Sequence, residues 1–377
     1  MKRVRSVGVF LFYFLLPTSA FPQGSLTPPG PPAPTMKSLD QVEARTPIPG
    51  GTAPVPINSP GSYYLTGNVS IFSVSSSTNG ITVYASNVTI DLNGFDLAGS
   101  ATSSGAGIFI ASGVSNVTIR NGTIRNWGSD GLNGSGNSKV RAEKLRVISN
   151  GGNGIAAGGT AEVLNCVAES NVGTGIKAMD NSIVKDSQAI ATTGKDGVGI
   201  SVGGAALVTG CVARSNSGNG IMVGNACKVE NCTVFGNTGD GINGGVVVAV
   251  NGCVLGSNGT NGIIVSDHAL IQNCHVNASA SLGIGVTNFS IVRDCTVDYT
   301  NSAGGDGIVV TGARNRIEAN NLTRNRNGIF VIGGVNLIIR NSASGNTNQD
   351  YLVSPGNDVG PIGSAATSTS PWANISY

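Results

Sequence analysis

Hydrophobic residues in the central part of the chain fall into short alternating runs that return at a fixed spacing. Each unit opens with a Gly-Ile pair, and a cysteine follows twelve residues after the glycine. The pairs at Gly220, Gly241, Gly262 and Gly283 are 21 residues apart. A fixed period of this length indicates stacked structural units that bury a shared core.

The same register continues toward both ends of the chain. The units open at Gly80, Gly107, Gly131, Gly154, Gly175, Gly199, Gly220, Gly241, Gly262, Gly283, Gly307 and Gly328. The cysteine position is filled by Gly122, Leu145, Cys166, Ser187, Cys211, Cys232, Cys253, Cys274, Cys295, Asn320 and Ser342. The pattern therefore predicts twelve units, and it persists where the cysteine is replaced.

Side-chain alternation predicts three short strands in each unit. Ile263 and Val265 follow a unit glycine with the period of two that is typical of a strand with one buried face. Ile271 and Val276 flank Cys274 with a spacing that breaks this parity, so the chain must bend between them. The bend residues tolerate a left-handed backbone. They are Asn121, Asn165, Asp186, Gly210, Asn231, Gly252, Asn273, Asp294 and Asn341.

Three strands and three corners in 21 to 27 residues predict an all-β fold, a single right-handed parallel β-helix. Its interior should consist of columns of aliphatic and cysteine side chains. We expect the β-helix domain to span residues 61–353. Residues 354–377 should form a C-terminal tail or cap.

The N-terminal region has a different character. Residues 1–20 read as a secretory signal peptide, with a basic start, an apolar run and a small-residue cleavage site. Residues 21–60 form a proline-rich linker. We therefore expect an exported protein, secreted, periplasmic or on the cell surface, with no stable membrane span after cleavage of the signal.

Charge and cysteine content narrow the function classes. The formal net charge is +2 and no basic tract occurs, which excludes nucleic acid as the expected partner. Five of the seven cysteines share one repeat position and are expected to be small buried groups, with an occasional disulfide left open. Cys227 lies outside this column and is interpreted as an unpaired corner residue. No C-x-x-C or Cys/His cluster is present, so we expect no metal and no cofactor.

The aspartates at repeat corners have two interpretations. Asp130, Asp240 and Asp306 each precede a unit glycine, where asparagine occurs in other units, so turn formation explains them. Asp91 and Asp96 flank an Asn-Gly turn and could form a sugar-cleaving pair, but a role in the turn is favoured.

One corner of the repeat carries candidate ligand-binding residues. Two units have three extra residues before the glycine, in loops 192–198 and 298–306. Loops on a rigid scaffold often carry binding residues. The candidates along this ridge are Trp127, Lys195, Asp196, Tyr299 and Asp306. Simple variation in loop length remains the alternative, and no catalytic residue is assigned.

From Gly61 to about Ser344 the repeats resemble the right-handed parallel β-helix proteins of the pectate-lyase-like superfamily. The unit N-G-I-I-V…I-Q-N-C-H-V is similar to NosD-type repeats. The superfamily includes polysaccharide lyases, polygalacturonases, alginate epimerases, phage tailspikes and non-catalytic surface proteins. Its lyases and galacturonases place acidic residues on the first-strand face, whereas that face here has Lys177 and no carboxylate. No catalytic residue is therefore carried over.

We expect an exported, non-catalytic β-helix that binds polysaccharide or serves as a surface or periplasmic scaffold. One alternative is a polysaccharide lyase or glycoside hydrolase acting on an acidic polysaccharide. Another is a phage-like or adhesive fibre. The sequence does not fix the oligomeric state.

Overall fold

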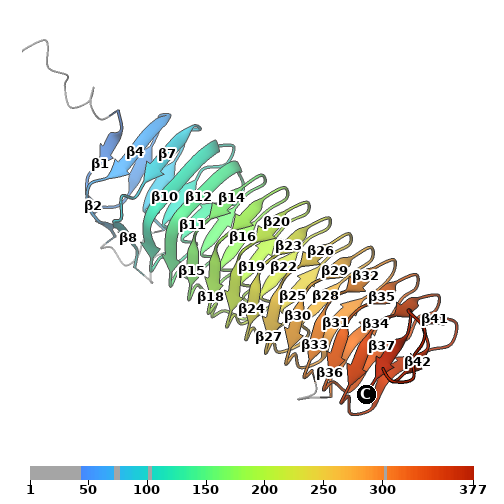
Figure 1. Ribbon diagram of the computed structural model, residues 1–377. Helices are drawn as coiled ribbons and strands as arrows, with labels where there is room; N and C mark the ends of the chain where they lie inside the picture. The colour runs from blue at the N-terminus through green and yellow to red at the C-terminus, as the bar shows by residue number, and fades with distance from the viewer. Residues whose placement is uncertain (1–43, 72–76, 101–103, 301–303) are drawn as a thin grey trace, which may run out of the picture. The chain divides into compact units, whose positions relative to one another are not determined.

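The computed structural model describes residues 44–71, 77–100, 104–300 and 304–377, and every regular element in these ranges is a β-strand. The predicted signal peptide, residues 1–20, and residues 21–43 of the predicted linker lie outside the described residues. Residues Arg45 to Tyr377 form one compact unit. Within it the chain winds as a right-handed parallel β-helix (Figure 1). The predicted fold class is therefore confirmed.

Two parallel sheets make up this unit. Sheet B has fourteen strands, one in each coil, and twelve of them begin at or next to a glycine of the repeat. Sheet A has 29 strands, because each coil contributes a strand on either side of the asparagine corner. The strands of sheet B are β3 (Val55–Ile57), β6 (Ile81–Val83), β9 (Ile108–Ile110), β11 (Leu132–Gly134), β13 (Ile155–Ala157), β16 (Ile176–Ala178), β19 (Ile200–Val202), β22 (Ile221–Val223), β25 (Ile242–Gly244), β28 (Ile263–Val265), β31 (Leu282–Val286), β34 (Asp306–Val310), β37 (Asn327–Val331) and β40 (Gln349–Val353).

Sheet A falls into two halves that meet at the corner. The half before the corner contains β1 (Thr46–Ile48), β4 (Gly61–Leu65), β7 (Val88–Asp91), β14 (Glu162–Leu164), β17 (Ile183–Lys185), β20 (Leu207–Thr209), β23 (Lys228–Glu230), β26 (Ala249–Asn251), β29 (Leu270–Gln272), β32 (Ile291–Arg293), β35 (Arg316–Glu318), β38 (Leu337–Ile339) and β41 (Asp358–Val359). The half after it contains β2 (Gly51–Thr52), β5 (Val69–Ser70), β8 (Asp96–Ala98), β15 (Val167–Glu169), β18 (Gln188–Ile190), β21 (Val212–Arg214), β24 (Thr233–Phe235), β27 (Val254–Gly256), β30 (His275–Asn277), β33 (Thr296–Asp298), β36 (Asn321–Thr323), β39 (Ser342–Ser344), β42 (Ile362–Gly363) and β43 (Asn374–Ser376). The long strands β10 (Ser115–Arg125) and β12 (Ser138–Ile148) run through both halves.

The corner within sheet A forms where the broken parity requires it. Eight of the nine predicted bend residues have a positive φ, for example Asn231 with φ 52° and Gly252 with φ 64°. The ninth prediction, Asn341, is wrong by one residue. Arg340 takes the left-handed conformation with φ 59°, and Asn341 points into the core in register with Asn320. The inward aliphatic residue of this coil is accordingly Ile338, paired with Ile317, and Ser342 does not occupy the cysteine position.

The β-helix has fourteen coils where twelve were predicted. The two extra coils contain β3 and β40, and neither of these strands opens with a Gly-Ile pair. Thr46–Ile48 and Val55–Ile57, which the sequence placed in the proline-rich linker, pair with β4 and β6 as part of the first coil. Pro47 and Pro56 are tolerated there because this coil is an edge of the stack.

Aliphatic columns fill the interior as predicted. Val229, Val250 and Ile271 are stacked on adjacent strands with no exposed surface. The cysteine column is buried and all seven cysteines are free thiols. Cys227 is a corner residue but is also buried, because it belongs to a second interior column in register with Ala206 and Ser182.

Asparagines form an interior column that the hydrophobic pattern did not indicate. Asn237, which is 1% exposed, donates its side-chain amide to Asn258 at 3.0 Å and receives the amide of Asn216 at 2.8 Å. Members of this column are Asn150, Asn171, Asn216, Asn237, Asn258, Asn325 and Asn346, with Thr192, Ser279 and Thr300 at the intervening coils. The asparagine side chains bond to backbone groups at a corner where the ladder of strand hydrogen bonds is interrupted, whereas the buried hydroxyl of Ser279 has no hydrogen-bond partner.

The C-terminal tail covers the last coil. Strand β43 pairs with β39, and Asn374 accepts a hydrogen bond from the Asn341 side chain at 3.1 Å. Strand β41 extends the other half of sheet A by pairing with β38. The tail thereby satisfies backbone groups that an open sheet edge would leave exposed.

Candidate functional site

The predicted ridge lies at the corner that leads from sheet A into sheet B. Trp127 is at this corner but is fully buried, so its predicted contact with a surface ligand is wrong. Its indole Nε1 donates to the Leu97 carbonyl at 3.1 Å, and its backbone N–H donates to Asn150. Trp127 thus takes the interior position that asparagine fills in the next coils. Space for the ring is provided by Gly80 and Gly99, where a Cβ would come within 2.8 Å of it.

The other candidate residues fall into two separate places on the ridge. Lys195 and Asp196 are exposed on the loop before β19. Tyr299 and Asp306 lie before and at the start of β34, five coils farther along sheet B. Coils are spaced by about 4.8 Å, so about 24 Å separates the two places. The structure therefore does not bring Lys195 and Asp196 together with Tyr299.

A column of left-handed residues runs along the ridge. Small residues fill most of it: Ser149, Ser170, Ala191, Ser215, Gly236, Ser257, Ala278 and Gly345. In two adjacent coils the column instead holds Tyr299 and Arg324, each with φ 57°. A left-handed backbone costs a residue with a side chain about 1–2 kcal/mol, and strain of this kind tends to accumulate at functional sites.

Tyr299 and Arg324 form an exposed pair on this ridge. The Arg324 guanidinium lies 5.7 Å from the centre of the Tyr299 ring, which is 48% exposed. Arg324 donates from Nε and Nη2 to Asp298, at 2.9 and 2.5 Å. Burial alone would raise the pKa of Asp298, but hydrogen bonds from Arg324 and Thr323 outweigh it and lower the pKa. The pair is therefore fixed as a cation beside an aromatic ring.

A groove of about 370 Å³ lies on the sheet B side of the same corner. Its walls are formed by Asp306, Arg326, Val309, Phe330 and residues 280–282 and 304. Arg326 donates two hydrogen bonds to Asp306, at 2.9 and 2.5 Å, and this carboxylate raises the pKa of the guanidinium. Two of the five N–H donors of Arg326 are thereby used, and the others remain for a ligand.

Carboxylates at the other predicted corner positions are engaged in turn hydrogen bonds. Asp240 accepts from the side chains of Asn243 and Asn261, both at 2.7 Å. Asp130 makes the equivalent bonds with Asn133 at 2.8 Å and Asn153 at 3.0 Å. Burial raises the pKa of Asp130, against the lowering effect of the hydrogen bonds from Asn153 and of the charge on Lys177. The geometry supports the interpretation of Asp130 and Asp240 as turn residues.

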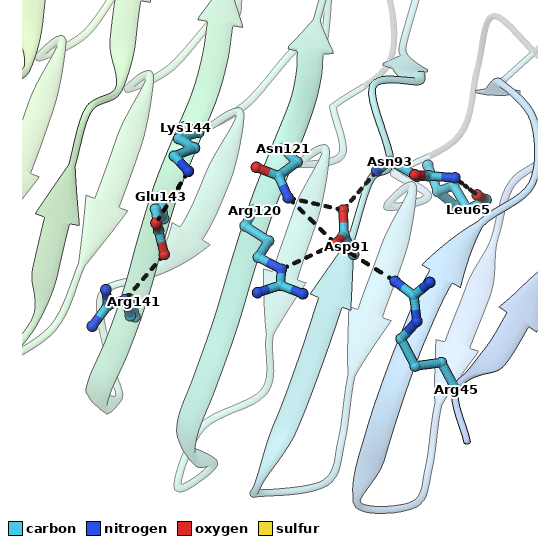
Figure 2. Close-up of polar contacts among 9 residues, drawn as sticks. All are labelled: Arg45, Leu65, Asp91, Asn93, Arg120, Asn121, Arg141, Glu143 and Lys144. Carbon is cyan, nitrogen blue, oxygen red and sulfur yellow. Dashed lines mark hydrogen bonds and ion pairs between the residues drawn. The ribbon is translucent and has the colours of Figure 1, made fainter. Parts of the chain in front are cut away.

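Asp91 is the centre of a second polar cluster, near the N-terminal end of sheet A. Figure 2 shows its carboxylate between Arg120, Asn121 and Arg45. Oδ2 accepts from Arg120 Nε at 3.0 Å, and Oδ1 accepts the backbone N–H of Asn93 at 2.9 Å. Asp91 is 6% exposed. This carboxylate holds the turn and links three coils, so little of it is left for catalysis.

Charged side chains on the same half of sheet A form ion pairs. Arg141 contacts Glu162 at 2.7 Å. It also contacts Glu143 at 3.4 Å, and Lys144 approaches Glu143 at 3.9 Å (Figure 2). Exposed pairs of this kind contribute at most about 1 kcal/mol each. The alternating signs indicate a solvated face. Within the described ranges, no three Cys, His, Asp or Glu side chains group as metal ligands.

Residues 61–205 and 196–348 match the family described as "Right handed beta helix region". The chain belongs to this family. A search of curated proteins found no match. Among the described residues there is no helix of the length and apolarity needed to cross a membrane.

Solved structures share this fold at low identity. The A-module of the mannuronan C-5 epimerase AlgE4 from Azotobacter vinelandii is 15% identical, with a TM-score of 0.54, over 80% of this chain and 91% of the module. The A-module of AlgE6 from the same organism is 14% identical, with a TM-score of 0.50, over 88% of this chain and 90% of the module. These likenesses establish the β-helix fold alone.

Arg324, Arg326 and Phe330 are the site residues that the sequence did not single out as candidates. The two arginines flank Asn325, a member of the interior column, so their side chains point away from the core. The sequence carries a usable signal for Arg324. It falls in a column that otherwise contains mainly serine, alanine and glycine, and an arginine there is conspicuous once the register is known.

Proposed function

We propose that this protein is an exported β-helix that binds an acidic polysaccharide on the ridge and groove formed by Tyr299, Arg324, Arg326 and Phe330, without catalysis of its own. The observation that carries the proposal is the pair of Tyr299 and Arg324, which occupy strained left-handed positions where neighbouring coils use small residues. Serine and alanine residues of the same column adopt the same backbone, so these two coils differ from their neighbours in the size of the side chains that they present to a ligand.

The chemistry of these side chains fits a chain of sugar acids. Guanidinium groups bind carboxylates through paired N–H donors, and Arg324 and Arg326 keep donors that their aspartates do not use. Tyr299 and Phe330 offer apolar ring faces against which a sugar ring can pack. The structurally similar epimerase modules are named for mannuronan, itself a polymer of sugar acids, which supports the same ligand class here.

Binding is tested by affinity electrophoresis of the exported protein in gels containing alginate, polygalacturonate or a neutral glucan. We expect retardation by the acidic polymers alone. Tyr299→Ala and Arg324→Ala should each weaken it about tenfold, which corresponds to about 1.4 kcal/mol. Tyr84→Ala is the matched control, because Tyr84 is an exposed tyrosine on another part of the rod, 58% accessible. Equal retardation of all variants would refute the proposed site.

An enzyme acting on a polyuronate is the second candidate function. It is favoured by one observation, the groove that places Arg326 beside Asp306 on a scaffold similar to epimerase modules. Incubation with alginate and polygalacturonate, with and without calcium, distinguishes the two. Unsaturated ends, new reducing ends or inverted C-5 centres that disappear in Arg326→Ala would replace the binding proposal. A trimer in light scattering would instead support the fibre alternative.

A further inference from the structure

A second concave surface lies at the C-terminal end of the rod, on the outer face of sheet A. It consists of two adjoining hollows of about 400 and 370 Å³, which share Arg316, Leu337 and Asp358. We call the two together the C-terminal groove. Its floor is formed by β35, β38 and β41, and Pro361 and Trp372 of the C-terminal tail overhang one end. The ridge residues Tyr299 and Arg324 are not among its walls.

The lining combines an apolar floor with fixed charges. Ile339 and Leu337 contribute apolar surface, and Arg316 lies among them with Nε and Nη2 bound to Glu318, at 2.8 and 2.5 Å. Arg314 lines the open end, and none of the ion pairs formed within the described residues involves it. Asp358, which is exposed, supplies a carboxylate that can accept hydrogen bonds from hydroxyl groups.

One aromatic ring, Trp372, lines the groove, and a second, Phe289, lies beside the lining residue Arg314. Arg340 lies 4.3 Å from the centre of the Trp372 ring, which is 48% exposed. At the other end Arg314 lies 5.4 Å from the Phe289 ring, and that ring stacks on His268 with centroids 4.7 Å apart. Orienting an exposed tryptophan with an arginine keeps one broad apolar face available at the mouth of the hollow.

We propose that the C-terminal groove binds a short acidic oligosaccharide, with one sugar ring against Trp372 and a carboxylate held by Arg314 and Arg316. The groove spans three coils, so its length along the rod is about 10 Å. A site of this length with an aromatic platform, two guanidinium groups and one carboxylate suits a short ligand that carries both hydroxyl and carboxylate groups. The ligand class follows the proposed function, but the groove is a separate surface with separate residues.

The two tryptophans of the chain make this proposal directly measurable. Trp127 is fully buried and Trp372 is half exposed, so acrylamide quenching of the fluorescence reports on Trp372. If the Trp127→Phe variant folds, it removes the residual fluorescence of the buried tryptophan. If it does not fold, the measurement uses the unchanged protein. Hexasaccharides of mannuronate and galacturonate should protect Trp372 from the quencher in a saturable manner. Maltohexaose, a neutral sugar of the same length, should not.

Single substitutions distinguish a loss of oligosaccharide binding from a loss of structure. Arg314→Ala should weaken protection by the acidic hexasaccharides at least tenfold. Arg214→Ala, which removes an exposed arginine from the middle of the rod, should leave it unchanged. Trp372→Ala should abolish binding at the groove in calorimetry while the circular dichroism spectrum is retained, because Asn374 anchors the tail independently.

Tyr299→Ala should leave the protection of Trp372 intact, so that a failure at the ridge and a failure at the C-terminal groove are distinguishable. Absence of protection by any acidic hexasaccharide would overturn the proposal. Equal protection by maltohexaose, or protection that persists in Arg314→Ala, would overturn it as well. Protection by a protein partner but by no oligosaccharide would reassign the groove to a different ligand class.

Discussion

The interior asparagine column gives the sharpest test of how this rod is held together, and Asn237→Ala is the perturbation. Asn237 accepts the backbone N–H of Asn216 at 3.1 Å and its side-chain amide at 2.8 Å. It also donates to the Ala213 carbonyl at 3.1 Å and to Asn258 at 3.0 Å. Alanine removes both acceptor contacts and leaves two buried donors on Asn216 without a partner.

Each buried donor that loses its partner costs about 1–3 kcal/mol, so the two together predict a loss of about 2–6 kcal/mol in the free energy of unfolding. Thr238→Ala is the matched control, because Thr238 is the next residue and is exposed. A substitution at such a surface position should change stability by no more than about 0.5 kcal/mol. The contrast compares an interior polar contact with a surface change in the same coil.

The assay is equilibrium unfolding in guanidinium chloride followed by far-ultraviolet circular dichroism. Stacked coils contact only their neighbours, so a weakened coil can open before the rest. Hydrogen exchange should therefore show the lost protection centred on the coils of Asn216, Asn237 and Asn258. If Asn237→Ala unfolds at the same denaturant concentration as Thr238→Ala, the asparagine column does not stabilise the rod, and the reasoning fails.

Four further predictions follow from the same structure. The seven thiols should not react with a water-soluble disulfide reagent at pH 8 until the protein unfolds, because every cysteine is buried and burial raises the pKa of Cys166 to about 12. All seven should react in the unfolded protein, and fast labelling of the native protein would contradict this prediction. Trp127→Ala should cost about 3–5 kcal/mol in the free energy of unfolding, since it empties a fully buried site, and a change below 1 kcal/mol would show that the ring is not packed in the core. Asp298→Asn should destabilise the protein at pH 7 but much less at pH 3. The pKa of Asp298 is lowered in the folded state, so the stability that this carboxylate contributes is present above the unfolded pKa of about 3.9 and is lost as the pH falls. Denaturant unfolding of the variant and of the unchanged protein at both pH values checks the direction of this change. Asp130→Asn should have the opposite profile, since burial raises the pKa of Asp130. The stability of the variant relative to the unchanged protein should rise as the pH increases from the unfolded pKa of about 3.9 through the higher folded pKa, and a difference that is the same at all pH values would contradict this.

The repeat could be predicted from the sequence because every coil presents the same buried face. Ile-x-Val runs and cysteines at constant spacing define inward positions without any knowledge of partners, and Val229 and Val250 are stacked as expected. Asparagine is ambiguous at this level, since it serves both as a corner residue and as an interior hydrogen-bonding residue. That ambiguity caused the error at Asn341, where asparagine fills the cysteine position and Arg340 forms the corner.

The burial of Trp127 could not be inferred from the sequence, because the repeat pattern does not show that its position faces inward. Trp127 stands where other coils place Asn150 or Asn171, and only the structure shows that this position faces inward. The space for the ring comes from glycines at positions 80, 99 and 107, which belong to two adjacent coils. The ends of the rod were missed because the first and last coils lack the glycine signature, although their backbones pair like the others.

Sites on a rod of this kind can diversify coil by coil, because each coil depends mainly on its two neighbours. Coils in the middle of the rod keep small residues in the left-handed column of the ridge, as at Ser215 and Ser257. Tyr299, Arg324 and the C-terminal groove all lie in the last few coils, where the structure also carries its overhanging tail. Regular coils thus provide rigidity, and the departures from regularity mark the surfaces where ligand recognition should be sought. If binding instead mapped to the regular middle coils, this separation of scaffold from site would have to be abandoned.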